Sequence, residues 1–139
     1  MDSRQIRLVQ ESFEKMAPRA DAISLRFYEH LFRIDPTMRP LFRADMESQS
    51  RKFMAMVRVT VRGLDRLEKL HPALVEMGAR HIAYGVEASH YEPMKQALLL
   101  AFREEMGAEF TAEIEQAWSA AYDVMAEAML SAERARKRG

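Results

Sequence analysis

Apolar residues recur at steps of three and four along nearly the whole chain, and no stretch alternates between apolar and polar residues with a period of two. Steps of three and four place side chains on one face of an α-helix, whereas a half-buried strand needs the period of two. The first periodic segment shows the pattern clearly, with Ile6, Val9, Phe13 and Met16. This periodicity predicts an all-α fold.

Capping residues and helix breakers divide the chain into seven expected helices. Asp2 and Gln5 resemble a capping box at the start of the first helix. Pro36 and Pro72 suit the first position of a helix, where the missing N–H costs nothing, and Thr111 is a candidate cap. We expect helices at residues 3–17, 19–34, 36–42, 49–64, 72–85, 91–106 and from 111 onward, with a polar connection over 43–48.

Length and charge exclude several classes of protein. A chain of 139 residues without internal repeats suits a single domain with one core. Lys and Arg together number 21, as do Asp and Glu, so the zero net charge argues against nucleic acid as the main partner. No apolar run approaches the ~18 residues of a membrane span. The first ten residues lack the pattern of a signal peptide, so we expect a cytoplasmic protein.

The chain contains no cysteine. This excludes disulfides, thiolate metal sites, iron–sulfur clusters, cysteine nucleophiles and thioether-attached haem together. Any metal chemistry must therefore use His, carboxylate or Tyr side chains. Three of the four histidines, His30, His71 and His90, lie in polar segments that are typical of the surface.

The fourth histidine, His81, shares an expected helix face with Leu74 and Gly78. A neutral imidazole there can give a lone pair to a metal, although a hydrogen-bonded core histidine is the commoner outcome. Tyr28 and Gln49 also have ordinary interpretations, as a tyrosine with a surface hydroxyl and a residue at a helix start. No catalytic triad, carboxylate pair or glycine-rich phosphate loop stands out. The residues alone predict a helical bundle with one candidate histidine site.

Residues 27–42, FYEHLFRIDPTMRPLF, resemble the second and third helices of the single-domain bacterial globins of the flavohaemoglobin lineage. QSRKFM at 49–54 and ARHIAYGVEASHY at 79–91 are similar to later segments of the same family. The resemblance implies a globin fold, with helices A, B, C, E, F, G and H around one non-covalently bound haem b. It also implies that residues 1–139 form a single globin domain without a reductase or output domain.

The resemblance assigns roles around the haem iron. The family's proximal ligand lies ten residues before the tyrosine of an HY pair, which selects His81 and places His90 at the corner beyond the ligand helix. Tyr28 and Gln49 match the distal residues that face the open coordination position. The expected haem pocket further comprises Phe27, Phe42, Phe53, Val57, Tyr91 and Tyr122.

Two further sets of residues follow from the same resemblance. Tyr91 and Glu133 match a hydrogen-bonding network around the proximal ligand, although Glu133 is close to the end of the printed sequence. Lys52 and Arg80 are candidate partners for the haem propionates, with plain surface exposure as the alternative.

The implied function is reversible, high-affinity O2 binding, with NO and CO as further ligands. A nitric oxide dioxygenase or NO-detoxifying enzyme that depends on a separate reductase is the alternative, because the same residues suit both activities. A haem-based gas sensor is less well supported, because no output domain is expected. A helical bundle without haem is the structural alternative.

Overall fold

The first helix begins at a capping box, as the sequence predicts. In the computed structural model, which describes residues 1–42, 45–83 and 85–138 and gives the backbone alone for 83 and 132–138, α1 spans Ser3–Met16. The Asp2 carboxylate accepts a hydrogen bond from the Gln5 backbone N–H at 2.8 Å. The Gln5 side chain accepts one in return from the Asp2 N–H at 3.2 Å. Two N–H groups without helical partners are thereby satisfied.

Five further α-helices follow, separated by short 3-10 segments. The α-helices are α2 (Ala20–Ile34), α3 (Met46–Arg62), α4 (Leu67–Ala83), α5 (Tyr91–Met106) and α6 (Ala112–Arg138). The 3-10 segments are η1 (Ala17–Arg19), η2 (Pro36–Leu41), η3 (Leu64–Arg66), η4 (Ala88–His90) and η5 (Gly107–Glu109). No strand occurs among the described residues, so the predicted all-α fold is confirmed.

The predicted start of α3 is wrong. The helix begins at Met46 rather than at residue 49, because the Asp45 carboxylate caps it by accepting from the Ser48 N–H at 2.9 Å. The expected polar connection over 43–48 therefore includes the first turn of the helix, and its residues 43–44 lie outside the described part of the chain.

The predicted start of α4 is also wrong, since the helix begins at Leu67 and Pro72 lies inside it. A proline at that position removes one backbone hydrogen bond. The flanking side chains Leu70 and Leu74 are both buried, so their packing offsets the loss. The expected short helix after Pro36 is a 3-10 helix rather than an α-helix.

Glycine marks helix ends, as expected. Gly107 follows α5 with φ +57°, and Gly85 follows α4 with φ +95°. These positive φ values suit glycine because it has no Cβ. The Thr111 hydroxyl accepts from the Ile114 N–H at 3.3 Å, so Thr111 caps the start of α6 as predicted.

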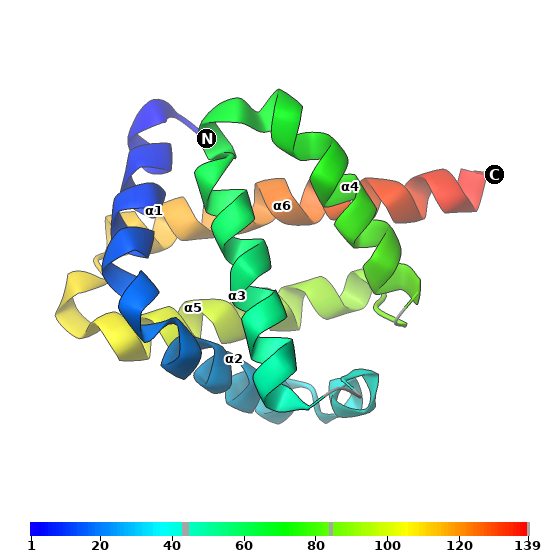
Figure 1. The fold of residues 1–139 in the computed structure, drawn as a ribbon, viewed down its shortest axis with the longest axis horizontal. Helices are drawn as coiled ribbons and strands as arrows, with labels where there is room; N and C mark the ends of the chain where they lie inside the picture. The colour runs from blue at the N-terminus through cyan, green and yellow to red at the C-terminus, as the bar shows by residue number, and fades with distance from the viewer. Residues whose placement is uncertain (43–44, 84, 139) are drawn as a thin grey trace.

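The helices form two crossing layers (Figure 1). α5 and α6 lie behind in that view, and α3 crosses in front of them. α4 packs mainly on α6, and α2 packs mainly on α5. The largest fully buried side chains in the described core are Ile23, Leu31, Met38, Leu64, Leu74 and Phe102.

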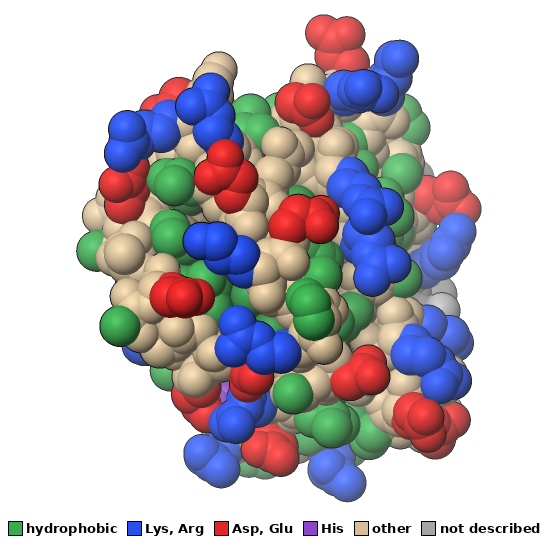
Figure 2. All heavy atoms as spheres, turned by 60° about the vertical axis from the view of Figure 1, so that its left-hand side comes forward, with side chains coloured by type: hydrophobic (Ala, Val, Ile, Leu, Met, Phe, Trp, Pro, Cys, Tyr) green, Lys and Arg blue, Asp and Glu red, His purple; other side chains and the backbone are tan. Residues whose placement is uncertain are grey.

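The surface mixes charges of both signs. Figure 2 shows Lys and Arg side chains interspersed with Asp and Glu, with small apolar areas between them. Within the described ranges, none of the helices combines the length and the apolarity that a bilayer crossing requires.

Candidate haem site

A cavity lies at the centre of the fold, between α3, α4, α5 and α6. It leaves about 600 Å³ between atoms when its open mouth is included. Its walls are almost wholly apolar and include Phe53 and Val57 from α3, Leu98 from α5, and Trp118, Met125 and Met129 from α6. We call this space the central cavity.

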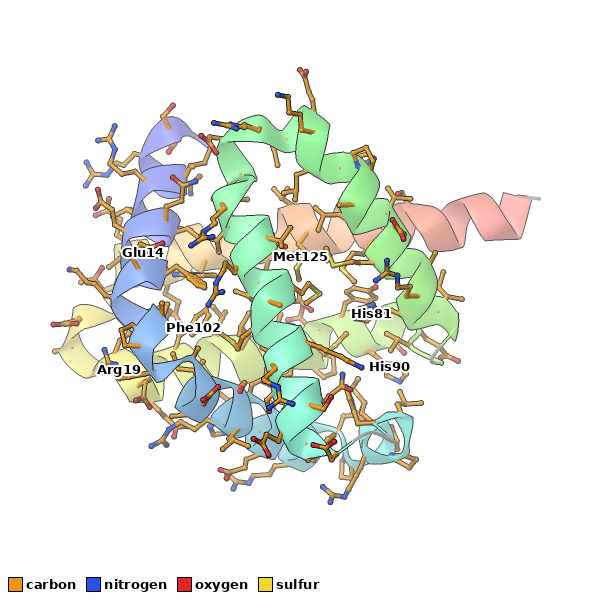
Figure 3. The ribbon with its side chains drawn as sticks, viewed as in Figure 1. Glu14, Arg19, His81, His90, Phe102 and Met125 are labelled. Carbon is orange, nitrogen blue, oxygen red and sulfur yellow. The ribbon has the colours of Figure 1, made fainter. Side chains whose placement is uncertain are left out.

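His81 reaches the central cavity from the last turn of α4 (Figure 3). Its Nδ1 lies 2.6 Å from the Met77 carbonyl oxygen. A carbonyl can only accept, so Nδ1 carries the proton and the ring's lone pair is on Nε2. Burial lowers the pKa of His81 below its ordinary value, against the opposing effect of the Met77 hydrogen bond. The imidazole is therefore neutral near pH 7, the form that ligates metals.

One turn before His81, Gly78 sets the approach of α4 to α6. A Cβ at Gly78 would lie 2.1 Å from the Met129 carbonyl oxygen and 2.7 Å from the Met129 Cα. No side chain fits this space, so glycine allows the two backbones to touch. His81 lies three residues after Gly78, and residues three apart share a helix face. The contact between Gly78 and Met129 therefore fixes the orientation of the α4 face that carries His81.

A short hydrogen bond joins the two tyrosines of the cavity wall. The Tyr122 hydroxyl donates to the backbone carbonyl of Tyr91 at 2.7 Å, and both residues are buried. Burial raises the pKa of Tyr122 well above its ordinary value, and the neighbouring Tyr91, Glu92 and Asp123 raise it further. The Tyr122 phenol therefore stays protonated and ties α6 to the first residue of α5.

Aromatic rings gather where α2 meets the start of α3. Phe27 and Phe53 stack with their centroids 4.2 Å apart and their planes 10° apart, and both line the central cavity. The Tyr28 ring meets Phe27 at 4.9 Å and Phe42 at 5.3 Å, both edge-on. Within the described part of the chain, Tyr28 and Phe42 are not among the lining residues.

Tyr28 and Gln49, 21 residues apart in sequence, are brought together. The Tyr28 hydroxyl donates to the Gln49 backbone carbonyl over 3.5 Å, which is a long and weak hydrogen bond. Burial raises the pKa of Tyr28 to about 12, although a hydrogen bond with the Gln49 side chain opposes that shift. The hydroxyl therefore keeps its proton at neutral pH.

Ser12 and Ser50 are buried near the site, and neither is among the residues predicted from the sequence. The Trp118 Nε1–H donates to Ser12 Oγ at 2.8 Å, and that hydroxyl donates to the Leu8 carbonyl at 2.7 Å. The Ser50 hydroxyl, beside Gln49, is buried without a hydrogen-bond partner among the described residues. A serine on an expected apolar helix face was the signal available at both positions.

Lys52, Arg80 and His90 are not among the residues that line the central cavity. Lys52 and Arg80 are exposed, and Arg80 bonds to Glu76 at 2.6 Å. His90 lies in η4, where its Nδ1 accepts from the Glu87 N–H at 2.9 Å. The side chain of Glu133 lies outside the described residues. The roles given to Lys52, Arg80 and Glu133 stay predictions.

The metal-binding side chains around the cavity suit a metal ion that is already held by a cofactor. Among the described residues, no group of three or more His, Asp or Glu side chains could bind a bare metal ion. One neutral imidazole in an apolar cavity is enough when the remaining ligands come from a porphyrin. The central cavity and His81 therefore fit a haem.

Comparisons with known proteins agree with this geometry. The Globin family model matches residues 25–129. A flavohemoprotein of Bacillus subtilis is 24% identical over 137 residues, which cover 96% of this chain and 34% of that protein. An uncharacterised globin-like protein of Aquifex aeolicus is 28% identical over 134 residues, covering 96% of this chain and 95% of that one.

Solved structures show the same similarity. An engineered carbene transferase, a candidate nitric oxide dioxygenase from Rhodothermus marinus, superposes with a TM-score of 0.88 at 28% identity. The match covers 99% of this chain and 96% of that one. The chain spans about a third of the length of the flavohemoproteins that it matches.

Proposed function

Since the chain belongs to the globin family, we propose that its central cavity holds one non-covalent haem b and that the protein reversibly binds O2. NO and CO are further ligands of the same site. The absence of cysteine excludes a thioether link to the protein, so the cofactor is held by His81 and by packing. Residues 1–139 are proposed to form one globin domain, and we expect this domain in the cytoplasm.

The hydrogen bond from His81 Nδ1 to the Met77 carbonyl is the observation that carries this proposal. It selects the tautomer whose Nε2 lone pair is available to iron, and it orients the ring. The apolar walls from Phe27, Phe53 and Val57 exclude water. When bound, haem supplies a ferrous iron with one coordination position open to a diatomic ligand.

Tyr28 and Gln49 are the proposed hydrogen-bond donors to that ligand. The Tyr28 phenol, with a pKa raised to about 12, keeps its proton and can donate to a ligand that carries partial negative charge. Its present bond to the Gln49 carbonyl is long at 3.5 Å, so exchanging it for a ligand costs little. The Gln49 amide would supply a second donor from the start of α3.

On the His81 side, Tyr91 and Glu133 are proposed to tune the imidazole through hydrogen bonds. Tyr91 lines the central cavity and is buried, which supports its part in this network. Lys52 and Arg80 are proposed to meet the haem propionates, since both long side chains are exposed and reach several ångströms.

Nitric oxide dioxygenation is the second candidate. The resemblance to flavohemoproteins and to a candidate nitric oxide dioxygenase favours it. In that reaction O2, NO and one electron combine to give nitrate. A separate reductase would supply the electron, and the same Tyr28 and Gln49 donors would serve.

Optical spectra of the purified protein test the proposal. Reduction and exposure to O2 should give a stable oxygenated spectrum, and Tyr28→Phe should raise the O2 dissociation rate about tenfold through the loss of one hydrogen bond. His71→Ala, at an exposed position of α4, is the control and should leave the O2 dissociation rate unchanged. No haem absorption after reconstitution would contradict the proposal for His81, and an unchanged O2 rate in Tyr28→Phe would contradict the role of Tyr28.

A further inference from the structure

The outward side of α3 carries a row of arginines that the proposed site does not use. Arg51, Ala55, Arg58, Val59 and Arg62 are all exposed, and their spacing places them along one stripe of the helix. We call these five residues the α3 cationic face. α3 lies at the front in Figure 1, and Lys and Arg side chains are prominent in the right-hand half of Figure 2.

This face lacks the carboxylates that neutralise arginines elsewhere. Arg26 on α2, for comparison, pairs with two glutamates of α5. On the α3 cationic face, Arg51 meets Glu47 at 3.4 Å, but both side chains are mostly exposed and such pairs contribute little. Within the described ranges, no carboxylate lies within 4.0 Å of Arg58 or Arg62. Arg58 and Arg62 are four residues apart, and like charges at this spacing destabilise a helix. The stability of α3 therefore does not explain why both positions carry an arginine.

The opposite side of the same helix forms a wall of the central cavity. Phe53, Met56, Val57 and Thr60 line the cavity from α3. A helix with its side chains is about 10 Å thick. A molecule seated on the α3 cationic face is therefore separated from the cavity by one helix.

We propose that the α3 cationic face docks an acidic electron-donor protein. This inference rests on the proposed function, in which a separate reductase restores ferrous iron after nitric oxide dioxygenation. The donor would be a reduced flavoprotein with a carboxylate-rich face. It would be oxidised by one electron for each haem iron that it reduces, and this transfer would neither form nor break a bond. Complementary charge steers such encounters and sets their orientation.

The composition of the face favours a protein partner over nucleic acid. Val59, 49% exposed, and Ala55 interrupt the arginines with apolar surface. Arginine is enriched in protein interfaces, where lysine is depleted. The zero net charge of the chain gives no general attraction to a polyanion.

A charge reversal tests the face with the haem-loaded protein. An acidic flavodoxin, reduced beforehand, is the probe, and the rate of iron reduction and the equilibrium binding of the two proteins are both measured. Arg58→Glu/Arg62→Glu should slow reduction at low salt by about tenfold or more, and the difference should vanish at high salt, because steering depends on ionic strength. Equilibrium binding should weaken in parallel, and Arg58→Lys/Arg62→Lys should restore most of both.

The matched control is Arg7→Glu/Lys15→Glu, which makes the same charge change at exposed positions of α1. This variant should be reduced by flavodoxin at the same rate as the unmodified protein and should bind flavodoxin equally well. Reduced riboflavin is small and has no protein surface that could dock on the α3 cationic face, so it should reduce the α3 and α1 variants at similar rates. Equal rates with flavodoxin for the α3 and α1 variants would overturn the proposal.

Two other outcomes would also overturn it, by assigning the face to another occupant. One is loss of self-association in the Arg58→Glu/Arg62→Glu variant alone, measured by sedimentation. The other is loss of duplex DNA binding in that variant, while its reduction by flavodoxin and its binding to flavodoxin stay unchanged. Failure of the unmodified protein to take up haem would contradict the proposed function, whereas normal haem and O2 binding without a charge effect would contradict only the docking face.

Discussion

The two sides of the central cavity are held together in different ways. On the His81 side, Gly78 lets α4 touch the Met129 backbone of α6, and Tyr122 donates to Tyr91 over 2.7 Å. On the Tyr28 side, the corresponding polar contact spans 3.5 Å. The side proposed to keep the cofactor is fixed by close contacts, while the side proposed to receive a ligand holds its donors weakly.

This difference suits the two proposed tasks. A permanent metal ligand benefits from an imidazole whose orientation is set before the cofactor arrives. An exchanging ligand needs donors whose existing bonds are easily replaced.

Replacing His81 should have the largest effect. His81→Ala removes the proposed iron ligand, so haem affinity should fall. The loss should exceed the factor of about 10–100 that is typical when a hydrogen-bonding partner of a metal ligand is removed. Haem transfer to an apoglobin acceptor measures this affinity, and added imidazole should restore the ferrous spectrum. His71→Ala, at an exposed position of the same helix, is the control and should change neither. Unchanged haem affinity in His81→Ala would show that the His81 side of the cavity does not hold the cofactor.

Filling the α4–α6 contact should come next. Gly78→Ala places a methyl group against the Met129 backbone, which cannot rotate away, so the free energy of unfolding should fall by about 1–3 kcal/mol. Urea unfolding of the apoprotein measures the change. Ala79→Ser on the exposed side of α4 should stay within about 0.5 kcal/mol. An equal response of both variants would show that the two backbones separate at little cost.

The two tyrosine hydroxyls provide a direct comparison of the sides. Tyr122→Phe leaves the buried Tyr91 carbonyl without its donor and should cost about 1–2 kcal/mol of unfolding free energy. Tyr28→Phe removes the long bond to the Gln49 carbonyl and a contact with the Gln49 side chain, and it should cost less, about 0.5 kcal/mol. Chemical denaturation of both variants measures the difference. Equal losses would remove the contrast between a tight and a loose side.

Alkaline pH should act through Tyr28. Its pKa is raised to about 12 in the folded protein, whereas the unfolded chain ionises near the ordinary value of 10.0. Between these values the folded state holds more protons, so stability falls as pH rises from 10 towards 12. The fall should be shallower in Tyr28→Phe, as unfolding curves across this range can measure. Parallel curves would mean that the Tyr28 hydroxyl is not desolvated.

The smallest expected change is a gain. Ser50→Ala removes a buried hydroxyl that has no partner among the described residues, so stability should rise by up to about 1 kcal/mol. Ser24→Ala is the matched control, because the Ser24 hydroxyl donates to the Asp21 carbonyl at 3.0 Å and its removal should destabilise. Destabilisation by Ser50→Ala would indicate that the hydroxyl has a hydrogen-bond partner. The Tyr28 side of the cavity would then be held together more tightly than the structure shows.

Local signals in the sequence predicted most of the helices and their caps. The Asp2–Gln5 capping box, the Thr111 cap and the Gly107 helix end all depend on neighbours within a few residues, and all are confirmed. The sequence predicts a helix start at Pro72 because the cost of a proline inside a helix depends on local geometry. The burial of Leu70, which offsets that cost, depends on contacts that the local sequence does not show.

The site was predictable only in part, for the same reason. His81 stands out on its helix face, but its tautomer depends on the Met77 carbonyl, and the placing of α4 depends on the distant Met129 backbone. Tyr28 and Gln49 meet only when α2 crosses α3. Ser50 gave no sign that its hydroxyl would be left unpaired. Contacts between segments distant in sequence are not encoded in any local pattern.

The hydrogen bond from Trp118 to Ser12 has a consequence for biosynthesis. It closes the fold between the first helix, which leaves the ribosome early, and the last, which leaves it late. Met125 and Met129 of α6 complete the central cavity, so a nascent chain that ends before them has a pocket with one wall missing. Cofactor capture therefore waits until α6 has been translated and has docked, and until then the apolar rings of Phe27 and Phe53 are surfaces that a chaperone can bind.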